Sequence, residues 1–425
     1  MGMNLKNSWQ EKLCISLCIF AIINQLILSL SWGHDSWQMT EWLINYAGGF
    51  VRRGLPGEVI LLVARQSKIQ ENYLVIFISF AIFFLVFAII RSKSKSYFSS
   101  AFLLSPVALG SAAYQDFIVR KDALGILFLL MCLHCHQKIK RPLVRLLICN
   151  TFACVAILSH ETFFFYALPA LIIINADLKS GAVLAHCKKI AISCVGYLPS
   201  IFTFALVTHF HGTWLTAKHI NLSLLHLWEI MDPMNTCNCL ADARGSIDAL
   251  AWTASEGLNL SKSVLSSYSN GIWVPLAWGI TIAFCYGATI HFLRRSNIGS
   301  IKDKNSNTYK SNLKSILIFQ FAMVSPLFIF GWDFGRWIFL WINSSICLFV
   351  YGYGGKLQQK ILASNEKGSI IESKNPSNLS YASLVLIGIP VCCWTLSRFL
   401  SGTPLGYVIN FLWENHYSQS ILITQ

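Results

Sequence analysis

Long apolar runs recur along the whole chain, and they constrain its fold more than any other feature of the sequence. A helix that crosses a membrane needs roughly 20 mainly apolar residues, and about eleven runs are candidates by that measure. They cover residues 13–32, 73–90, 98–115, 122–136, 143–159, 161–176, 188–208, 272–293, 314–331, 337–354 and 380–400. The runs at 122–136 and 161–176 are short enough to be half-spans. The pattern therefore predicts an all-α polytopic membrane protein, a single integral membrane domain over residues 1–425.

The charged residues support this prediction and orient the chain. Only 12% of the residues are charged, against about 25% in a soluble protein, while the net charge is +14. If the N-terminus is cytoplasmic and the spans alternate, every inner loop is basic, as the positive-inside rule requires. The positive charge therefore predicts an orientation in the membrane, with membrane lipid as the surroundings, and it does not indicate a nucleic-acid partner.

The first outer loop, residues 33–72, contains an amphipathic pattern. Apolar side chains from residue 39 to residue 46 recur at the spacing of one helical face, and Glu41 lies on the opposite, polar face. We therefore expect a juxtamembrane helix that lies on the outer interface and ends at Gly48–Gly49. Asp35 precedes this helix. It is either a catalytic carboxylate or the N-cap of the helix, and both interpretations stay open.

Three other loops have distinct compositions. The large outer loop at 209–271 contains enough Trp and Leu for short helices that lie on the membrane or cap a cavity. The loops at 294–313 and 355–379 are rich in Ser, Asn and Lys, and we expect them to be solvated cytoplasmic connectors.

Further polar clusters fall at the predicted outer ends of spans, where ionisable groups are costly and are therefore candidates for function. Arg52 and Arg53 lie among glycines, a combination typical of phosphate sites, although a surface loop in contact with lipid headgroups is the alternative. Arg120 and Lys121 lie in a tight outer turn at 116–122 that is either a phosphate or sugar site or a self-neutralising turn.

Two more clusters complete the set. His160 and Glu161 form a turn that is either a general base with a tuned pKa or the cap of the next helix. Asp333 and Arg336, in a segment flanked by tryptophans, either aim a guanidinium at a substrate or form a structural ion pair. No cofactor is expected; the alternative of a divalent metal stays open, although no metal-ligand spacing accompanies these residues.

These motifs resemble those of bacterial polysaccharide polymerases of the O-antigen type, within the GT-C class of membrane glycosyltransferases. The resemblance rests on the acid of the first outer loop, the juxtamembrane helix, and the stretches Arg52-Arg53-Gly54, His160-Glu161 and Asp333 to Trp337. The chain differs from many members of the class, which carry an acidic pair where this chain has the single acid Asp35.

The resemblance implies a function at the periplasmic face of a bacterial inner membrane. The expected partners are a polyprenyl-(di)phosphate-linked sugar donor and a saccharide acceptor. Asp35 would take the proton of the acceptor hydroxyl, with His160 and Glu161 as the rival base. Arg52, Arg53 and Arg336 would bind the departing phosphate. The alternative is a transporter or flippase of a lipid-linked saccharide, which the absence of detectable internal repeats disfavours.

Overall fold

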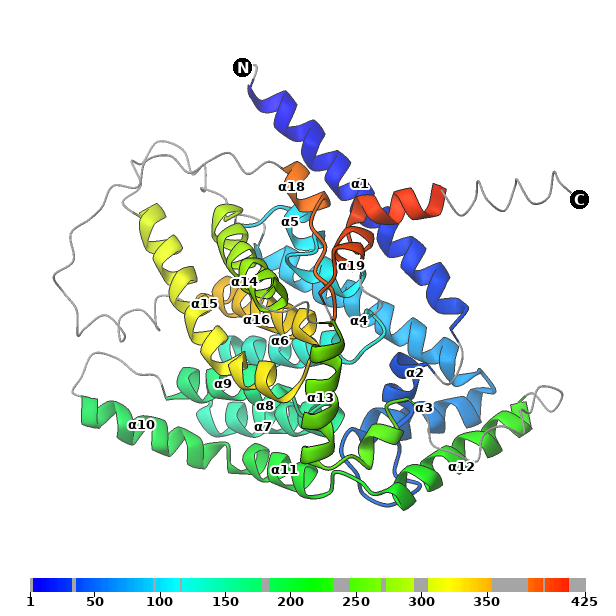
Figure 1. Ribbon diagram of the computed structural model, residues 1–425. Helices are drawn as coiled ribbons and strands as arrows, with labels where there is room; N and C mark the ends of the chain where they lie inside the picture. The colour runs from blue at the N-terminus through cyan, green and yellow to red at the C-terminus, as the bar shows by residue number, and fades with distance from the viewer. Residues whose placement is uncertain are drawn as a thin grey trace, which may run out of the picture.

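The computed structural model describes residues 3–32, 36–94, 97–114, 117–176, 183–231, 245–268, 273–293, 305–353, 381–392 and 394–412 (Figure 1). Regular structure in these residues is helical throughout. The elements are α1 (Met3–Leu30), α2 (Trp37–Leu43), α3 (Gly54–Ser67), α4 (Glu71–Ser94), α5 (Ser100–Leu104), η1 (Leu109–Ala112), α6 (Asp122–Lys138), α7 (Pro142–Ser159), α8 (Phe163–Tyr166), α9 (Leu168–Asn175), α10 (Val183–Gly196), α11 (Leu198–His209), α12 (Trp214–Met231), η2 (Asp248–Leu250), α13 (Ala254–Tyr268), α14 (Trp273–His291), α15 (Asn305–Phe330), α16 (Phe334–Val350), α18 (Tyr381–Val385) and α19 (Leu396–Ser401).

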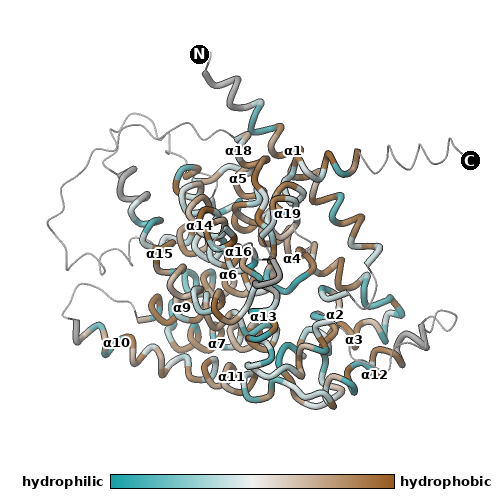
Figure 2. The backbone as a smooth tube through the Cα atoms, in the orientation of Figure 1, coloured by the Kyte–Doolittle hydropathy of each residue, from teal (hydrophilic) through white to brown (hydrophobic). Residues whose placement is uncertain are grey.

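Five of these helices are long and apolar enough to cross a membrane. They are Trp9–Leu30 of α1, α4, α7, α14 and Ser311–Phe330 of α15. A sixth span is obtained if α10 and α11, which meet at a bend of 62°, are counted as one. Figure 2 shows hydrophobic residues running along α4, α14 and α16. The all-helical prediction is confirmed for the described residues, whereas the count of eleven spans is not.

Proline explains several of the shorter helices. The run at 98–115 is interrupted at Ser105, which precedes Pro106 and has the extended backbone that this position favours. The run at 161–176 is divided into α8 and α9 at Ala167, and Pro169 begins the second piece. In the run at 380–400, the short helices α18 and α19 are separated by a segment that includes Pro390.

Helix α16 forms the centre of the structure. Its side chains are buried from Gly335 to Phe349, and a helix that is apolar on all sides is expected to be enclosed by others. It packs against α4, α6, α14 and α15. The indole of Trp341 is 2% exposed and donates to the backbone oxygen of Leu317 at 2.7 Å, which ties α16 to α15.

The predicted juxtamembrane helix exists as α2, but its polar face is not on the surface. Ser36 caps it by accepting from the backbone nitrogen of Met39, and the helix ends at Leu43, before the expected Gly48–Gly49. Glu41 is 0% exposed. The expectation of a polar face turned away from the protein is therefore wrong for this residue.

Glu41 is enclosed by the segments that carry Arg53, Arg120, His160 and Arg336. The loop at 209–271 covers neighbouring residues of the first loop. Thr40 accepts a hydrogen bond from the backbone nitrogen of Ser246 at 2.9 Å, and Asn45 donates to Ser223 of α12 at 3.1 Å. The loop contains the helices α12 and α13, and its residues 232–244 lie outside the described part of the chain. It covers the first loop, so that α2 is an internal helix.

The structure describes part of one of the two predicted cytoplasmic connectors, 294–313, and none of the other, 355–379. Helix α15 begins at Asn305, so the last part of the 294–313 segment is helical and the connector is shorter than expected. Its residues 294–304 and the whole of 355–379 lie outside the described residues.

Candidate functional site

A cluster of ionisable side chains lies where five segments of the chain meet. These are α2, the loop before α3, the turn at the start of α6, the residues between α7 and α8, and the start of α16. We call it the charge cluster, and its members are Glu41, Arg52, Arg53, Arg120, Lys121, Asp122, His160, Glu161, Asp333 and Arg336. Charges away from water are costly unless they are paired, so the pairing decides what each member can do.

Arg53 and Glu161 form the outermost pair. The Nε of Arg53 donates to both carboxylate oxygens of Glu161, at 3.1 and 2.8 Å, and its Nη2 also donates to this carboxylate. Burial would raise the pKa of Glu161, but Arg53 and His160 hold that pKa well below its usual value. The carboxylate therefore stays ionised and committed to Arg53, which makes it a weak candidate for a general base.

The backbone of Arg53 is itself unusual. Its φ is +64°, in the left-handed region that non-glycine residues rarely occupy. Its carbonyl oxygen accepts a hydrogen bond from Nζ of Lys121 at 3.0 Å. Strained backbone of this kind persists where the surroundings hold it in place, and such positions cluster at functional sites.

Arg336 joins two carboxylates at the inner side of the cluster. It forms a bidentate pair with Asp122, at 2.7 and 3.1 Å, and its Nη1 donates to Asp333 at 2.8 Å. Arg120 donates to the same oxygen of Asp333, also at 2.8 Å. Burial would raise the pKa of Asp333, but Arg120 and Arg336 lower it below its usual value. Asp333 is thus a fixed anion between two arginines.

His160 is held on both ring nitrogens. Its Nδ1 lies 3.3 Å from the backbone nitrogen of Thr162, which donates to it, and 3.0 Å from the hydroxyl of Thr162. Its Nε2 lies 3.0 Å from Oε1 of Glu41 and 3.3 Å from Nη2 of Arg336. Burial lowers the pKa of His160, and Arg53 lowers it further, which favours the neutral ring.

Glu41 lies at the centre of the cluster. Besides His160, its carboxylate is 3.7 Å from Arg53, 3.7 Å from Arg336 and 4.0 Å from Arg120. Neither of its oxygens accepts a well-aligned hydrogen bond from the described residues. Burial would raise the pKa of Glu41, but Arg336, His160 and Arg120 together hold it well below its usual value. Glu41 is therefore an anion stabilised by the surrounding guanidinium groups and by the adjacent ring of His160.

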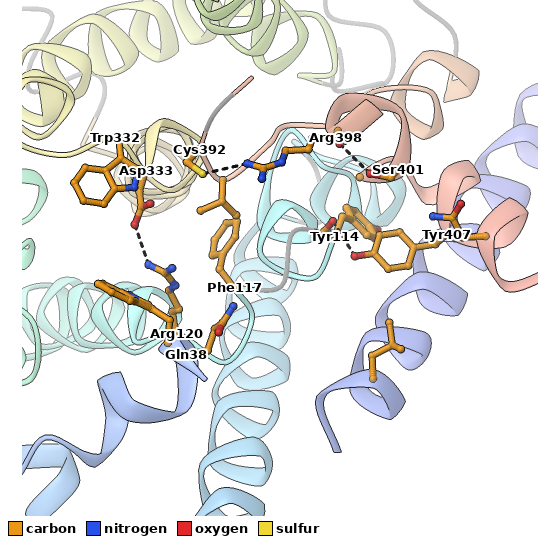
Figure 3. Close-up of a pocket in the computed structure, with 15 residues that line it drawn as sticks. Gln38, Tyr114, Phe117, Arg120, Trp332, Asp333, Cys392, Arg398, Ser401 and Tyr407 are labelled. Carbon is orange, nitrogen blue, oxygen red and sulfur yellow. Dashed lines mark hydrogen bonds and ion pairs between the residues drawn. The ribbon is translucent and has the colours of Figure 1, made fainter. Parts of the chain in front are cut away.

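A pocket of about 620 Å³ borders the charge cluster (Figure 3). Arg120 and Asp333 belong to both, and they are the cluster members that line the pocket. Aromatic rings make up much of the remaining wall, together with polar side chains and the residues of the C-terminal segment. The other lining residues are Leu28, Trp37, Gln38, Tyr114, Phe117, Trp332, Val391, Cys392, Arg398, Ser401, Gly402, Tyr407 and Asn410.

The structure thus places the predicted site residues in three groups. Arg120 and Asp333 face the pocket. Arg53, Lys121, His160, Glu161 and Arg336 lie in the cluster but not on the pocket wall, and each has a protein partner. Arg52, at the edge of the cluster, donates to the backbone oxygen of Ala249 at 3.1 Å. Asp35 lies outside the described residues, and its assignment as base stays a prediction; Trp37, two positions later, lines the pocket.

Three residues of this region could not be assigned a role from the sequence. Glu41 was predicted on a polar helix face, Asp122 within a turn, and Arg398 inside a span. The helical spacing around Glu41 gave no sign of which face is covered, because most of the side chains that surround it lie far along the chain, at Arg120, His160 and Arg336. Arg398 carried a usable signal, since a charge inside an apolar run is a candidate for function.

No metal-binding group was found in the described part of the chain, in the sense of three or more His, Cys, Asp or Glu side chains placed to hold an ion. The acidic members of the charge cluster are instead bound to arginines.

The chain matches a known protein family. Residues 12–355 match the model of a protein family described as "Uncharacterised membrane protein Rv1490". The match covers more than half of the chain and includes every member of the charge cluster, whereas Arg398 lies beyond it. No curated protein and no solved structure matches the chain. The family and the apolar helices together identify an integral membrane protein.

Proposed function

We propose that this chain, which belongs to the Rv1490 family of membrane proteins, is a glycosyltransferase with a polyprenyl-(di)phosphate-linked sugar donor. It acts at the periplasmic face of a bacterial inner membrane and polymerises or extends a surface polysaccharide. The observation that carries the proposal is the pocket of about 620 Å³ whose wall combines aromatic rings with the Arg120–Asp333 pair of the charge cluster.

The chemistry of the pocket fits a sugar attached to phosphate. The faces of Trp37 and Trp332 offer apolar surface for a sugar ring, and their indole nitrogens are hydrogen-bond donors. Arg120 presents a guanidinium, the group best suited to phosphate oxygens. Two carboxylates hold this guanidinium in position: Asp333 accepts its hydrogen bond, and Glu41 lies 4.0 Å from its Nε.

The reaction is a displacement at the anomeric carbon of the donor. The acceptor oxygen forms a bond to that carbon, and the bond between the carbon and the phosphate oxygen breaks, leaving its electron pair on the phosphate. Arg120 stabilises this developing charge, an effect worth about 3–4 kcal/mol for preorganised donors in comparable sites. The proton of the acceptor passes to Asp35. Arg53 and Arg336 hold the cluster together in this proposal, because their guanidinium groups are bound to carboxylates.

The test is transfer of labelled sugar from a polyprenyl-phosphate donor to a saccharide acceptor by the purified protein in lipid vesicles. We expect Asp35→Asn to lower kcat by about 100-fold or more, the size of a general-base contribution. Arg120→Gln should lower kcat/KM by about the same factor. Arg65→Gln, an exposed arginine of α3, is the matched control and should transfer sugar normally. Full activity in Asp35→Asn and in His160→Ala would eliminate both proposed bases.

The same proposal predicts a cellular phenotype that separates it from lipid-linked saccharide transport. Deleting the gene and separating the surface polysaccharide on a gel should reduce a ladder to one repeat unit if the protein is a polymerase. Loss of every repeat unit would instead indicate flipping, and an unchanged ladder would contradict both functions.

A further inference from the structure

We propose that Gln38 is a specificity-determining residue, whose side-chain amide selects an uncharged sugar by binding a hydroxyl or acetamido group of its ring. This inference rests on the proposed function, which places a sugar beside the tryptophans of the same pocket. It concerns the recognition of that sugar alone and is tested by binding.

Helix α2 directs Gln38 to the pocket and Glu41 to the charge cluster. The two residues are three positions apart, so they lie on the same side of the helix. The carboxylate of Glu41 lies 4.0 Å from Nε of Arg120, and Arg120 lines the pocket together with Gln38. Figure 3 shows these two pocket residues below Asp333 and Trp332. Gln38 therefore lies at the end of the pocket that borders the charge cluster.

The backbone around Gln38 is held on both sides. The hydroxyl of Ser246 donates to the backbone oxygen of Trp37 at 2.8 Å, and the backbone nitrogen of Ser246 donates to the hydroxyl of Thr40 at 2.9 Å. The next side chain along the helix, Met39, is 0% exposed. A side chain on a fixed backbone loses less conformational freedom when it binds a ligand, which favours binding.

Gln38 differs from its charged neighbours in the partners of its side chain. Arg120 donates to Asp333, and Asp333 also accepts from Arg336. The amide of Gln38, by contrast, makes no hydrogen bond to any residue that the structure describes. The indole nitrogen of Trp332 likewise has no partner within the described part of the chain. Both groups lie on the pocket wall and are therefore available to a ligand.

The chemistry of the amide favours an uncharged group on the ligand. A side-chain amide carries two donor hydrogens and an acceptor oxygen, and hydroxyl and acetamido groups also combine a donor with an acceptor. A carboxylate could use only the donors, and it would meet the amide oxygen of Gln38 and the carboxylate of Asp333 on the same wall. Trp332 adds a donor beside an apolar ring face. This combination suits a neutral sugar ring rather than a uronic acid.

The experiment measures binding of methyl glycosides to the full chain in nanodiscs by saturation-transfer NMR. The probes are the methyl glycosides of glucose, galactose, mannose and N-acetylglucosamine, each paired with its uronic acid. We expect the wild type to bind at least one neutral glycoside, and its uronic acid more weakly. Gln38→Met, which removes the amide from an unbranched side chain, should weaken binding of the neutral glycoside by about tenfold.

The matched control is Gln66→Met, the same change at an exposed position of α3, which should bind like the wild type. Equal affinity of the wild type and Gln38→Met would overturn the inference. Failure of the wild type to bind any of the neutral glycosides, or tighter binding of the uronic acid, would overturn it as well.

Deoxy derivatives of the bound glycoside separate recognition by Gln38 from a structural role. Removing the substituent that Gln38 binds should weaken binding to the wild type by about tenfold but leave binding to Gln38→Met unchanged. Removing any other bound substituent should weaken both proteins alike. A purely structural role would lower the affinity for every derivative by the same factor, and that result would contradict the inference.

The inference and the proposed function fail under different results. If binding of a neutral glycoside depends on Gln38 but no sugar is transferred, the proposed function fails and the inference stands. If sugar is transferred and binding does not depend on Gln38, only the inference fails.

Discussion

At the scale of single residues, the arginines that the predicted topology places on the outer side were informative. Arg53, Arg120 and Arg336 stood out in the sequence for this reason, and the structure brings all three within 4.0 Å of one carboxylate. That carboxylate, Glu41, could not be predicted. Periodicity assigns a residue to a helix face, but which face is buried depends on segments that are distant in the sequence.

Lys121 shows how burying a charged side chain lowers the free energy of unfolding. Its side chain is 1% exposed, and burial lowers its pKa from the ordinary 10.5 to about 7, with Arg53 adding to the effect. Glu41 and Glu161 oppose the shift only in part. Between these two pH values the unfolded chain binds the proton more tightly than the folded chain. The free energy of unfolding therefore rises with pH across this window and is lowest below about pH 7.

We predict that Lys121→Met removes this part of the pH dependence. The methionine is unbranched and close to lysine in length, but it does not titrate and it lacks the ammonium group that lies 5.8 Å from the Trp42 ring. The measurement is Tm in detergent at several pH values between about 7 and 10. The rise of Tm with pH should be smaller in the variant than in the wild type, and parallel curves would show that Lys121 is not the group responsible.

At the scale of helices, the sequence predicted which segments are helical better than it predicted where a helix is interrupted. The run at 337–354 corresponds closely to α16, Phe334–Val350. By contrast, the run at 380–400 is two short helices around a segment that contacts α16. Apolar composition alone cannot distinguish a helix that crosses the membrane from an apolar segment packed inside the protein. The C-terminal wall of the pocket was missed for this reason.

Gly335 is the point where α16 and this segment meet. A Cβ at this position would lie 2.0 Å from the backbone oxygen of Pro390, which is too close for any side chain. We predict that Gly335→Ala displaces the segment at 390–391 and, with it, Arg398. Tm should fall, and binding of the polyprenyl-linked sugar donor, measured as its KM in the transfer assay, should weaken with it.

The matched control for this change is Gly279→Ala in α14. A Cβ there meets nothing within 4 Å, and alanine favours a helix over glycine by about 1 kcal/mol. The control should have an unchanged or slightly higher Tm and normal binding. Similar behaviour of the two variants would show that the contact between Gly335 and Pro390 does not hold the pocket wall.

At the scale of the whole molecule, the orientation in the membrane is a prediction from the sequence. The basic loops predict that the N-terminus is cytoplasmic and that the 33–72 loop is outside. The exposed positions Gln66, in that loop, and Lys140, between α6 and α7, lie on opposite sides in this topology.

We therefore predict that Gln66→Cys reacts with a membrane-impermeant maleimide in intact spheroplasts, whereas Lys140→Cys reacts only after the membrane is permeabilised. Both changes are made in a chain in which Cys237 and Cys239, also expected outside, are replaced by Ser. Exposed Cys187 is an internal control, since it is expected on the same side as Lys140. Reversed labelling would invert the topology and place the pocket at the cytoplasmic face.

The charge cluster also has a consequence for biosynthesis. Glu41 and Arg53 leave the ribosome long before Asp333 and Arg336, the last members to be synthesised. Until then Asp122 lacks the guanidinium that neutralises it in the finished protein. The early loops must therefore remain hydrated while the intervening helices insert. The final helices then close the structure around charges that the predicted topology has already placed on the far side of the membrane. For this reason, a chain truncated before residue 336 should insert into the membrane, but its helices should not pack into the folded structure.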